Sequence, residues 1–205
     1  MIERDEWTTD EFGASHRGVV GVLLADGTVP EPVYFDAASG PGGSSVSQWY
    51  VYDGHGTRPR AAALRAVCSC GWTGPHHALA WQQATEDPSD AEELVEVGDA
   101  QAGACERDWD AHTIDVAATA VPLPEPVTAL LAQLETEIEN LTRTSPVAAV
   151  RATRSLEVLA GRLGYWAAHD TRRDLPLPET AAALALTEDA TRHLLARLGQ
   201  WSPYL

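Results

Sequence analysis

The cysteines are the residues of this sequence best suited to hold a metal ion. Cys68 and Cys70 are separated by one serine in the stretch Cys-Ser-Cys-Gly-Trp-Thr-Gly, residues 68–74. Two thiolates this close together can chelate one ion from a tight bend, and zinc prefers thiolate and imidazole ligands in a tetrahedral set of four. Gly71 lets the chain turn away after the second cysteine. The bend therefore predicts half of a zinc site, although a spacer of two residues is more usual.

The other half of the predicted site lies further along the chain, on a predicted helix. Cys105, Asp108 and His112 are spaced at i, i+3 and i+7, so they share one face of a helix. We expect the ligand set to be Cys68, Cys70, Cys105 and His112, which uses every cysteine in the chain. Four protein ligands leave no position for water, so the prediction is one structural zinc per chain.

Rival ligands and rival interpretations remain open. Asp108, His76 and His77 could each supply the fourth ligand, and both histidines are close in sequence to the cysteine pair. The thiols could instead be buried as small apolar groups, or serve in redox chemistry or iron binding. With an open fourth position near His76, His77 or His55, the zinc would be that of a hydrolase. We expect the closed site and no enzymatic activity.

Other sequence patterns that could indicate a binding or catalytic site are incomplete. The segment Gly40–Gly43 lacks the lysine and the strand–helix context of a phosphate-binding loop. The acidic run Glu86–Asp99 lacks the spacing of an EF-hand. His55 stands between two glycines, which is typical of a hairpin turn. No serine has a base and an orienting group that can be recognised from sequence.

Composition and charge limit the partners. The 205 residues include 14 basic residues, all of them arginine, against 30 acidic ones, and the formal net charge is −16. Twenty of the acidic residues lie in residues 1–123. Contacts with phosphate supply much of the affinity for DNA, so a chain this acidic would bind DNA only through a local patch. The charge favours solubility and basic partners.

The expected compartment is the cytoplasm. The first residues lack the basic start and apolar core of a signal peptide, and no apolar run approaches the ~18 residues that span a bilayer. We therefore expect no membrane segment. Three cysteines in a reducing compartment argue against disulfides and for metal binding or inert thiols.

The segments before the predicted helix indicate a small, mostly antiparallel sheet. Residues 1–16 are expected to form a loose arm, and 37–47, rich in glycine and serine, a flexible loop. Residues 75–84 are expected to contain a helical turn or two. The predicted strands, each apolar or β-branched, are 17–24, 33–35 as its hairpin partner, 47–52 and 61–67.

Helices are predicted for the rest of the chain. Ser89 is the expected N-cap of the helix that carries His112, although Gly98 and Gly103 each cost about 1 kcal/mol against alanine in a helix. Apolar residues from Val127 to Leu141 recur at helical spacing, and this stripe could seek a second copy of the chain. Further breaks are predicted at 145–146, 175–178 and 186–187.

The last two predicted helices resemble a helix-turn-helix, with Thr187 as the cap of the second. A recognition helix meets DNA near its N-terminus, where this one carries Glu188 and Asp189, and phosphate repels both. DNA binding is thus weakly supported. The residues that remain for DNA contact are Arg172, Arg173, Arg192, His193 and Arg197.

The two halves of the predicted zinc site also carry a resemblance. Cys-Ser-Cys-Gly-Trp-Thr-Gly at 68–74 and Ala-Cys-Glu-Arg-Asp-Trp-Asp-Ala-His at 104–112 resemble a set of functionally uncharacterised proteins from GC-rich bacteria. These pair a CxCGW bend with a later helix that ends in histidine, and the similarity covers about residues 60–200. It implies an architecture and no activity. Cys68, Cys70 and His112 match the pattern, whereas Asp108 stands where it has a second histidine.

The expected fold is α+β. Residues 1–121 would form a small antiparallel sheet with a zinc-clamped helix, and residues 124–205 a helical bundle. The expected function is that of a non-enzymatic regulatory or adaptor protein that binds a protein partner, with a homodimer as one form of such binding. The alternative is a helix-turn-helix transcriptional regulator.

Overall fold

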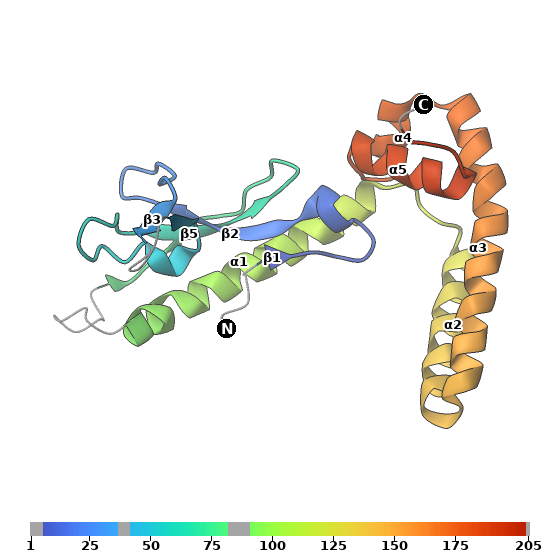
Figure 1. Cartoon of the computed structure of the whole chain (residues 1–205), viewed down its shortest axis with the longest axis horizontal. Helices are drawn as coiled ribbons and strands as arrows, with labels where there is room; N and C mark the ends of the chain where they lie inside the picture. The colour runs from blue at the N-terminus through green and yellow to red at the C-terminus, as the bar shows by residue number, and fades with distance from the viewer. Residues whose placement is uncertain (1–5, 37–41, 82–90, 204–205) are drawn as a thin grey trace. The chain divides into compact units, whose positions relative to one another are not determined.

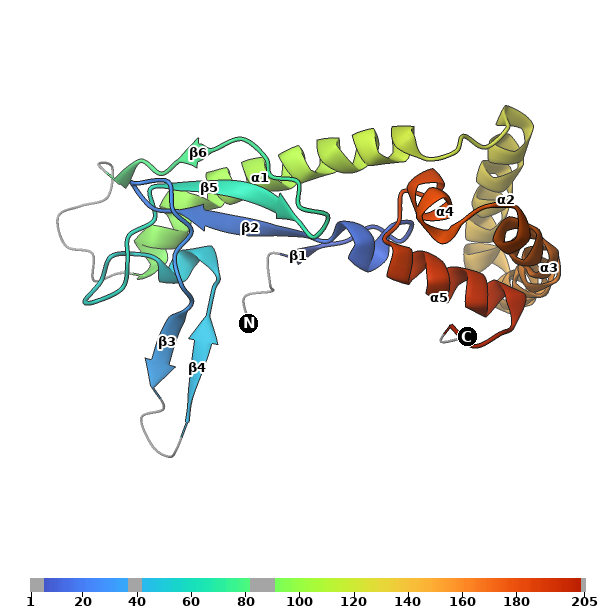
Figure 2. The ribbon, with the colours of Figure 1, turned by 90° about the horizontal axis from the view of Figure 1, so that it is seen from above.

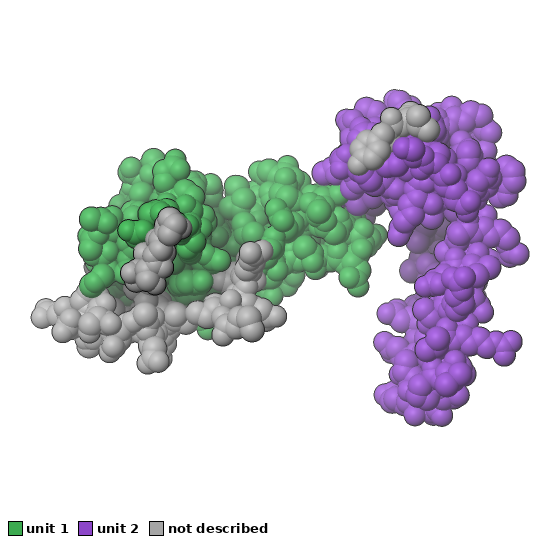
Figure 3. Space-filling view, viewed as in Figure 1, with its two compact units in different colours: residues 1–115 green, residues 116–205 purple. Residues whose placement is uncertain are grey.

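The computed structural model describes residues 6–36, 42–81 and 91–203, with side chains from residue 98 in the last range. The fold is α+β, as predicted. Its contacts divide the chain into two compact units, residues 1–115 and 116–205 (Figure 3). Within the described ranges, no helix is both long enough and apolar enough to cross a membrane.

The first unit is built on a four-stranded antiparallel sheet in the order β1-β2-β5-β6 (Figure 2). Its strands are β1 (Glu6–Trp7), β2 (Gly18–Leu23), β5 (Ala63–Cys68) and β6 (His77–Ala78). The register pairs Gly18 with Cys68 and Leu23 with Ala63. Because side chains alternate along a strand, Val20 and Val22 of β2 and Leu64 and Ala66 of β5 share the buried face.

Helix α1 (Ala91–Thr119) lies along β2 and β5 in both ribbon views (Figures 1 and 2). Ala102, Cys105 and Trp109 of α1 join the core on the buried face of the sheet. Two glycines permit this close packing. A Cβ on Gly18 would overlap the indole of Trp109, and one on Gly98 would overlap the indole of Trp49. Gly98 thus lowers the local helix propensity of α1 but allows the helix to pack closely against Trp49.

Four expectations for the first unit are wrong. Residues 1–16 are not a loose arm, because they contain β1 and the 3-10 turn η1 (Gly13–His16). Residues 47–52 are not a strand. They contain the 3-10 turn η2 (Trp49–Val51), which turns the side chain of Trp49 into the core. Strand β3 (Val33–Asp36) pairs with β4 (Gly43–Val46), part of the expected loop, and not with β2. The described part of 75–84 contains β6 where a helical turn was expected. The predicted N-cap Ser89 lies outside the described residues.

The second unit is helical, and its breaks fall where they were predicted. Its helices are α2 (Glu125–Thr144), α3 (Pro146–Asp174), α4 (Leu177–Ala183) and α5 (Glu188–Gly199). Thr187 caps α5, because its hydroxyl accepts a hydrogen bond from the backbone N–H of Ala190. In the turn before it, Ala185 has a φ of 51°, a left-handed conformation that usually favours glycine.

Candidate metal centre

Four side chains of the first unit form a group that could hold a metal ion: His16, Cys68, Cys70 and His112. Their four ligand atoms all lie within 4.8 Å of one another. The sulfur of Cys68 is 3.8 Å from Nδ1 of His16, and the sulfur of Cys70 is 3.4 Å from Nε2 of His112. Bonds of about 2.0–2.3 Å to a tetrahedral zinc separate neighbouring sulfur and nitrogen ligands by about 3.5 Å. These two separations are close to that value, so the group could hold an ion in a tetrahedral site.

The strand register explains why His16 belongs to this group. Gly18 lies opposite Cys68 in an antiparallel pair, so the chain before Gly18 and the chain after Cys68 leave the sheet side by side. His16 and Cys70 each lie two residues beyond that pair. His16 ends the 3-10 turn η1 (Gly13–His16), which places it beside the bend. The place of His16 in this group was not predicted, because residues 1–16 were expected to form a loose arm.

The bend itself has the form expected from the sequence. The N–H of Gly71 donates to the carbonyl of Cys68, and the N–H of Cys68 donates to the carbonyl of Trp72, both at 2.9 Å. Gly71 has a φ of 94°, a conformation that glycine adopts readily. The turn therefore fixes the backbone on both sides of Cys70 and presents its sulfur on the surface.

Ser69, the spacer between the two cysteines, ties the bend to η1. Its hydroxyl accepts a hydrogen bond of 2.9 Å from the N–H of Arg17 and donates one of 3.0 Å to the carbonyl of Ala14. Its own N–H donates to the carbonyl of Arg17 at 2.8 Å. These three bonds hold the backbone on either side of His16, so the spacer positions a ligand on another segment.

Aromatic neighbours orient both imidazoles. The ring of Trp72 stacks on His112 with centroids 4.2 Å apart and an angle of 3° between the planes. Phe12 meets His16 edge to face at 5.5 Å. Burial lowers the pKa of His112, and the nearby His16 lowers it further, against an opposing effect of Asp115. A lowered pKa favours the neutral imidazole, which is the form that binds metals.

The surroundings of Cys68 also suit a metal-bound thiolate. Burial raises the pKa of the Cys68 thiol, whereas the indole N–H of Trp109 lowers it. That N–H is buried and has no well-formed hydrogen bond within the described residues. A buried donor beside a sulfur has its best acceptor in a thiolate, and such donors commonly support metal ligands.

Cys105 is not part of the group, and His16 takes the place that was expected for Cys105. Cys105 is fully buried in the core, and burial raises the pKa of its thiol to about 12, with a smaller contribution from Asp108. The physical reason is that Cys105 and His112 lie too far apart along α1 to bind the same ion. Seven residues separate Cys105 from His112, which places them about 10 Å apart along the axis although they share a face.

The rival ligands lie outside the group as well. His77 of β6 and Asp108 of α1 pair with each other, Nε2 to Oδ2, at 2.6 Å. This contact ties the edge strand β6 to α1. His76 is exposed and is not part of the group. Of the residues expected to bind the ion, the structure brings together Cys68, Cys70 and His112.

Most of the candidate DNA contacts in the second unit have acidic or aromatic neighbours. Arg173 pairs with Asp170 and Asp174. Arg192 and His193 both contact Asp189. These carboxylates weaken the attraction of the two arginines for phosphate.

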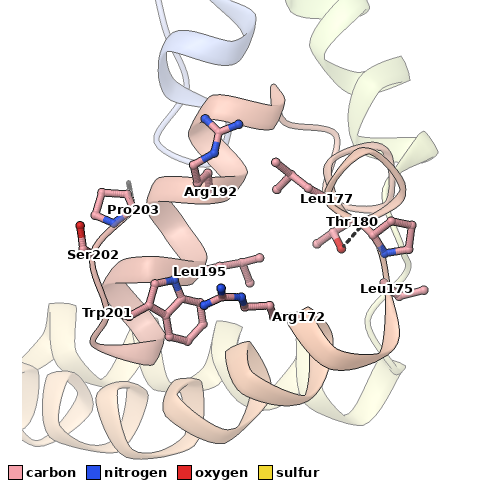
Figure 4. A pocket seen from close by; sticks show the side chains of 10 residues that line it. Arg172, Leu175, Leu177, Thr180, Arg192, Leu195, Trp201, Ser202 and Pro203 are labelled. Atoms are coloured by element: carbon pink, nitrogen blue, oxygen red, sulfur yellow. Dashed lines mark hydrogen bonds between the residues drawn. The ribbon is translucent and has the colours of Figure 1, made fainter. Parts of the chain in front are cut away.

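Arg172 lies over the ring of Trp201 at 5.1 Å. Together with Arg192 and Leu195 it lines a pocket of about 530 Å³ in the second unit (Figure 4). Arg197 is exposed near the end of α5. DNA binding by these residues stays a prediction.

Comparison with known proteins gives no match to a family model, a curated protein or a solved structure. The resemblance to bacterial proteins with a CxCGW bend therefore stays a prediction.

Proposed function

We propose that the first unit is a zinc-binding module whose ion is structural, within a non-enzymatic adaptor or regulatory protein. The observation that carries this proposal is the clustering of four ligand atoms, two sulfur and two nitrogen, within 4.8 Å. Thiolate and imidazole in equal number are a typical ligand set for structural zinc. With all four positions filled by the chain, the ion has no open position for water or substrate.

The position of the site supports a structural role. Its ligands come from η1, the end of β5, the following bend and α1. In this arrangement the ion joins segments that are distant in sequence, at the end of the sheet where β2 and β5 meet the helix. The acidic charge of the chain and the apolar helix surfaces of the second unit support the adaptor role.

Metal analysis of the purified full-length chain tests the proposal. We expect one zinc per chain in the wild type and in Cys105→Ala, because Cys105 belongs to the core. His16→Ala should lower the zinc affinity by at least 100-fold, as should Cys70→Ser. If Cys105→Ala lost the zinc while His16→Ala kept it, the ligand set proposed here would be wrong. A wild-type chain that takes up no zinc would refute the proposal as a whole.

A second prediction concerns the spacer. Ser69→Ala removes a hydroxyl that holds η1 beside the bend, so the zinc affinity should fall by about 10-fold, a loss typical of residues that position metal ligands. Competition with a chromophoric chelator measures this. Ser155→Ala is the control, because the Ser155 hydroxyl bonds only to Arg151 in α3. Equal affinities in the two variants would show that Ser69 does not position the site.

DNA binding is the alternative function, and one feature favours it: α4 and α5 are joined by a short turn with a capped second helix, as in a helix-turn-helix. A salt titration distinguishes the two functions. Affinity for duplex DNA that persists at physiological salt and falls in Arg172→Ala or Arg197→Ala would support a DNA-binding regulator. Binding that vanishes at that salt would leave the adaptor role.

A further inference from the structure

We propose that the hairpin of α2 and α3 packs against the same hairpin of a second copy of the chain, forming a four-helix bundle at the centre of a homodimer. This inference is independent of the zinc site. In the described part of the second unit, α2 has 20 residues and none of them is buried. Helices gain most of their stability by burying an apolar face, so a helix of this length without buried residues is incompletely packed by α3 alone.

The exposed apolar residues of α2 form a single stripe. Leu130 is 66% exposed, Leu131 53% and Val127 42%. At helical spacing these residues and Leu134 point in similar directions, toward α3 and its edges. Contact with α3 alone covers only part of this stripe, and Figure 1 shows the two helices running side by side. The remaining area needs further helices.

Helix α3 continues the apolar surface on one side. Leu159 is 40% exposed, Leu163 60% and Trp166 66%. Helix α5 packs on a different side of α3, because a Cβ on Gly164 would meet Leu198 of α5. Helical periodicity places Leu159 and Leu163 well away from that side and next to the edge of α2 that carries Leu130. We call the four residues Leu130, Leu134, Leu159 and Leu163 the hairpin face.

The charges of α2 and α3 favour a second copy of the chain as the partner that covers the hairpin face. Helix α2 carries four glutamates and one arginine, whereas α3 carries five arginines and three acidic residues. In a two-fold dimer, α2 of one copy can lie against α3 of the other, so that each acidic helix meets a basic one. By helical spacing, Glu137 of α2 and Arg162 of α3 lie beside the hairpin face, so such a dimer brings the helices that carry them together.

The available area agrees with a dimer. Each exposed leucine, valine or tryptophan here presents on the order of 100 Å² to solvent, and a stable interface buries about 800 Å² per partner. By the same estimate the hairpin face with Val127 and Trp166 supplies about 600 Å² of this area, and the polar residues around it would supply the rest. Packing two hairpins at the shallow angle usual in bundles turns four partly exposed helices into a common core.

Sedimentation equilibrium of the full-length protein tests the inference. We expect a dimer at micromolar concentration, and a rise of at least 100-fold in the dissociation constant for Leu163→Glu. The matched control is Val147→Glu, because Val147 is 83% exposed but lies on the opposite side of α3. This variant should dimerise like the wild type. Circular dichroism should show the same helix content in both variants.

A charge swap keeps the test valid if Leu163→Glu fails to fold. Glu137→Arg should weaken the dimer by about 10-fold, and the double variant Glu137→Arg with Arg162→Glu should restore it. A wild type that is monomeric at 100 μM or above would overturn the proposal and assign the hairpin face to a different protein. A dimer that Leu163→Glu and the charge swap leave intact would also overturn it, because the interface would then lie elsewhere.

Discussion

Removing the metal with a chelator should lower the melting temperature of the first unit by about 20 °C. An ion present at about 1,000 times its dissociation constant stabilises the folded state by about 4 kcal/mol. For a domain of about 100 residues, each 1 kcal/mol changes the melting temperature by about 4–8 °C. The unit should still fold without the ion, because most of its core, including Val20, Leu64 and Trp49, consists of residues that are not ligands. Differential scanning calorimetry with and without chelator measures the shift.

Hydrogen exchange shows where the stability is lost. Amides of β5 and of η1 should exchange faster after chelation, whereas those of α2 and α3 should be unchanged, and returned zinc should restore the original rates. A chelator that leaves the melting curve unchanged, or that speeds exchange only in the second unit, would contradict a structural ion held by His16 and Cys68.

Two glycines of the same helix should respond to alanine with opposite signs. Alanine is favoured over glycine in a helix by about 1 kcal/mol. At Gly103 the new methyl group would meet only the flexible end of Arg107, at 3.6 Å, so Gly103→Ala should raise the free energy of unfolding by up to about 1 kcal/mol. At Gly98 it would overlap the ring of Trp49. Gly98→Ala should therefore lower the free energy of unfolding by about 2 kcal/mol, since overpacking a core costs about 1–3 kcal/mol.

Urea unfolding followed by circular dichroism compares the two variants. The mechanism is isolated by repeating Gly98→Ala in a Trp49→Leu background, where the smaller side chain leaves room for the methyl group. There the penalty should largely disappear, which is a coupling energy between residues in contact. If Gly98→Ala stabilised the wild type as much as Gly103→Ala does, α1 would not approach Trp49 as closely as described here.

The sequence predicted the bend that carries the cysteine pair and the order of the helices, because these depend on local signals. Cys68, Cys70 and Gly71 lie within one turn, and Thr187 or Pro146 marks a helix start wherever the helix later packs. His16 could not be found in this way, because its role depends on which residues of β2 and β5 face each other. Once Gly18 is paired with Cys68, His16 and Cys70 follow.

The errors have the same origin. Cys105 has the spacing of a ligand relative to His112, but the depth of the core at that turn of α1 determines that it packs against the sheet. Residues 47–52 have the β-branched and aromatic composition of a strand, yet burying Trp49 against Gly98 requires a 3-10 turn. Strand propensity describes a half-buried pleated surface, and here tertiary packing overrides it.

The pairing of Gly18 with Cys68 has a consequence for how the chain folds. If β2 slipped by one residue along β5, every side chain of β2 would turn to the other face, and His16 would no longer stand opposite Cys70. Only the correct register of β2 and β5 brings all four ligand residues together. An ion that binds during folding would therefore stabilise only the chains with that register. The metal would then favour the correct strand register during folding as well as stabilise the folded sheet.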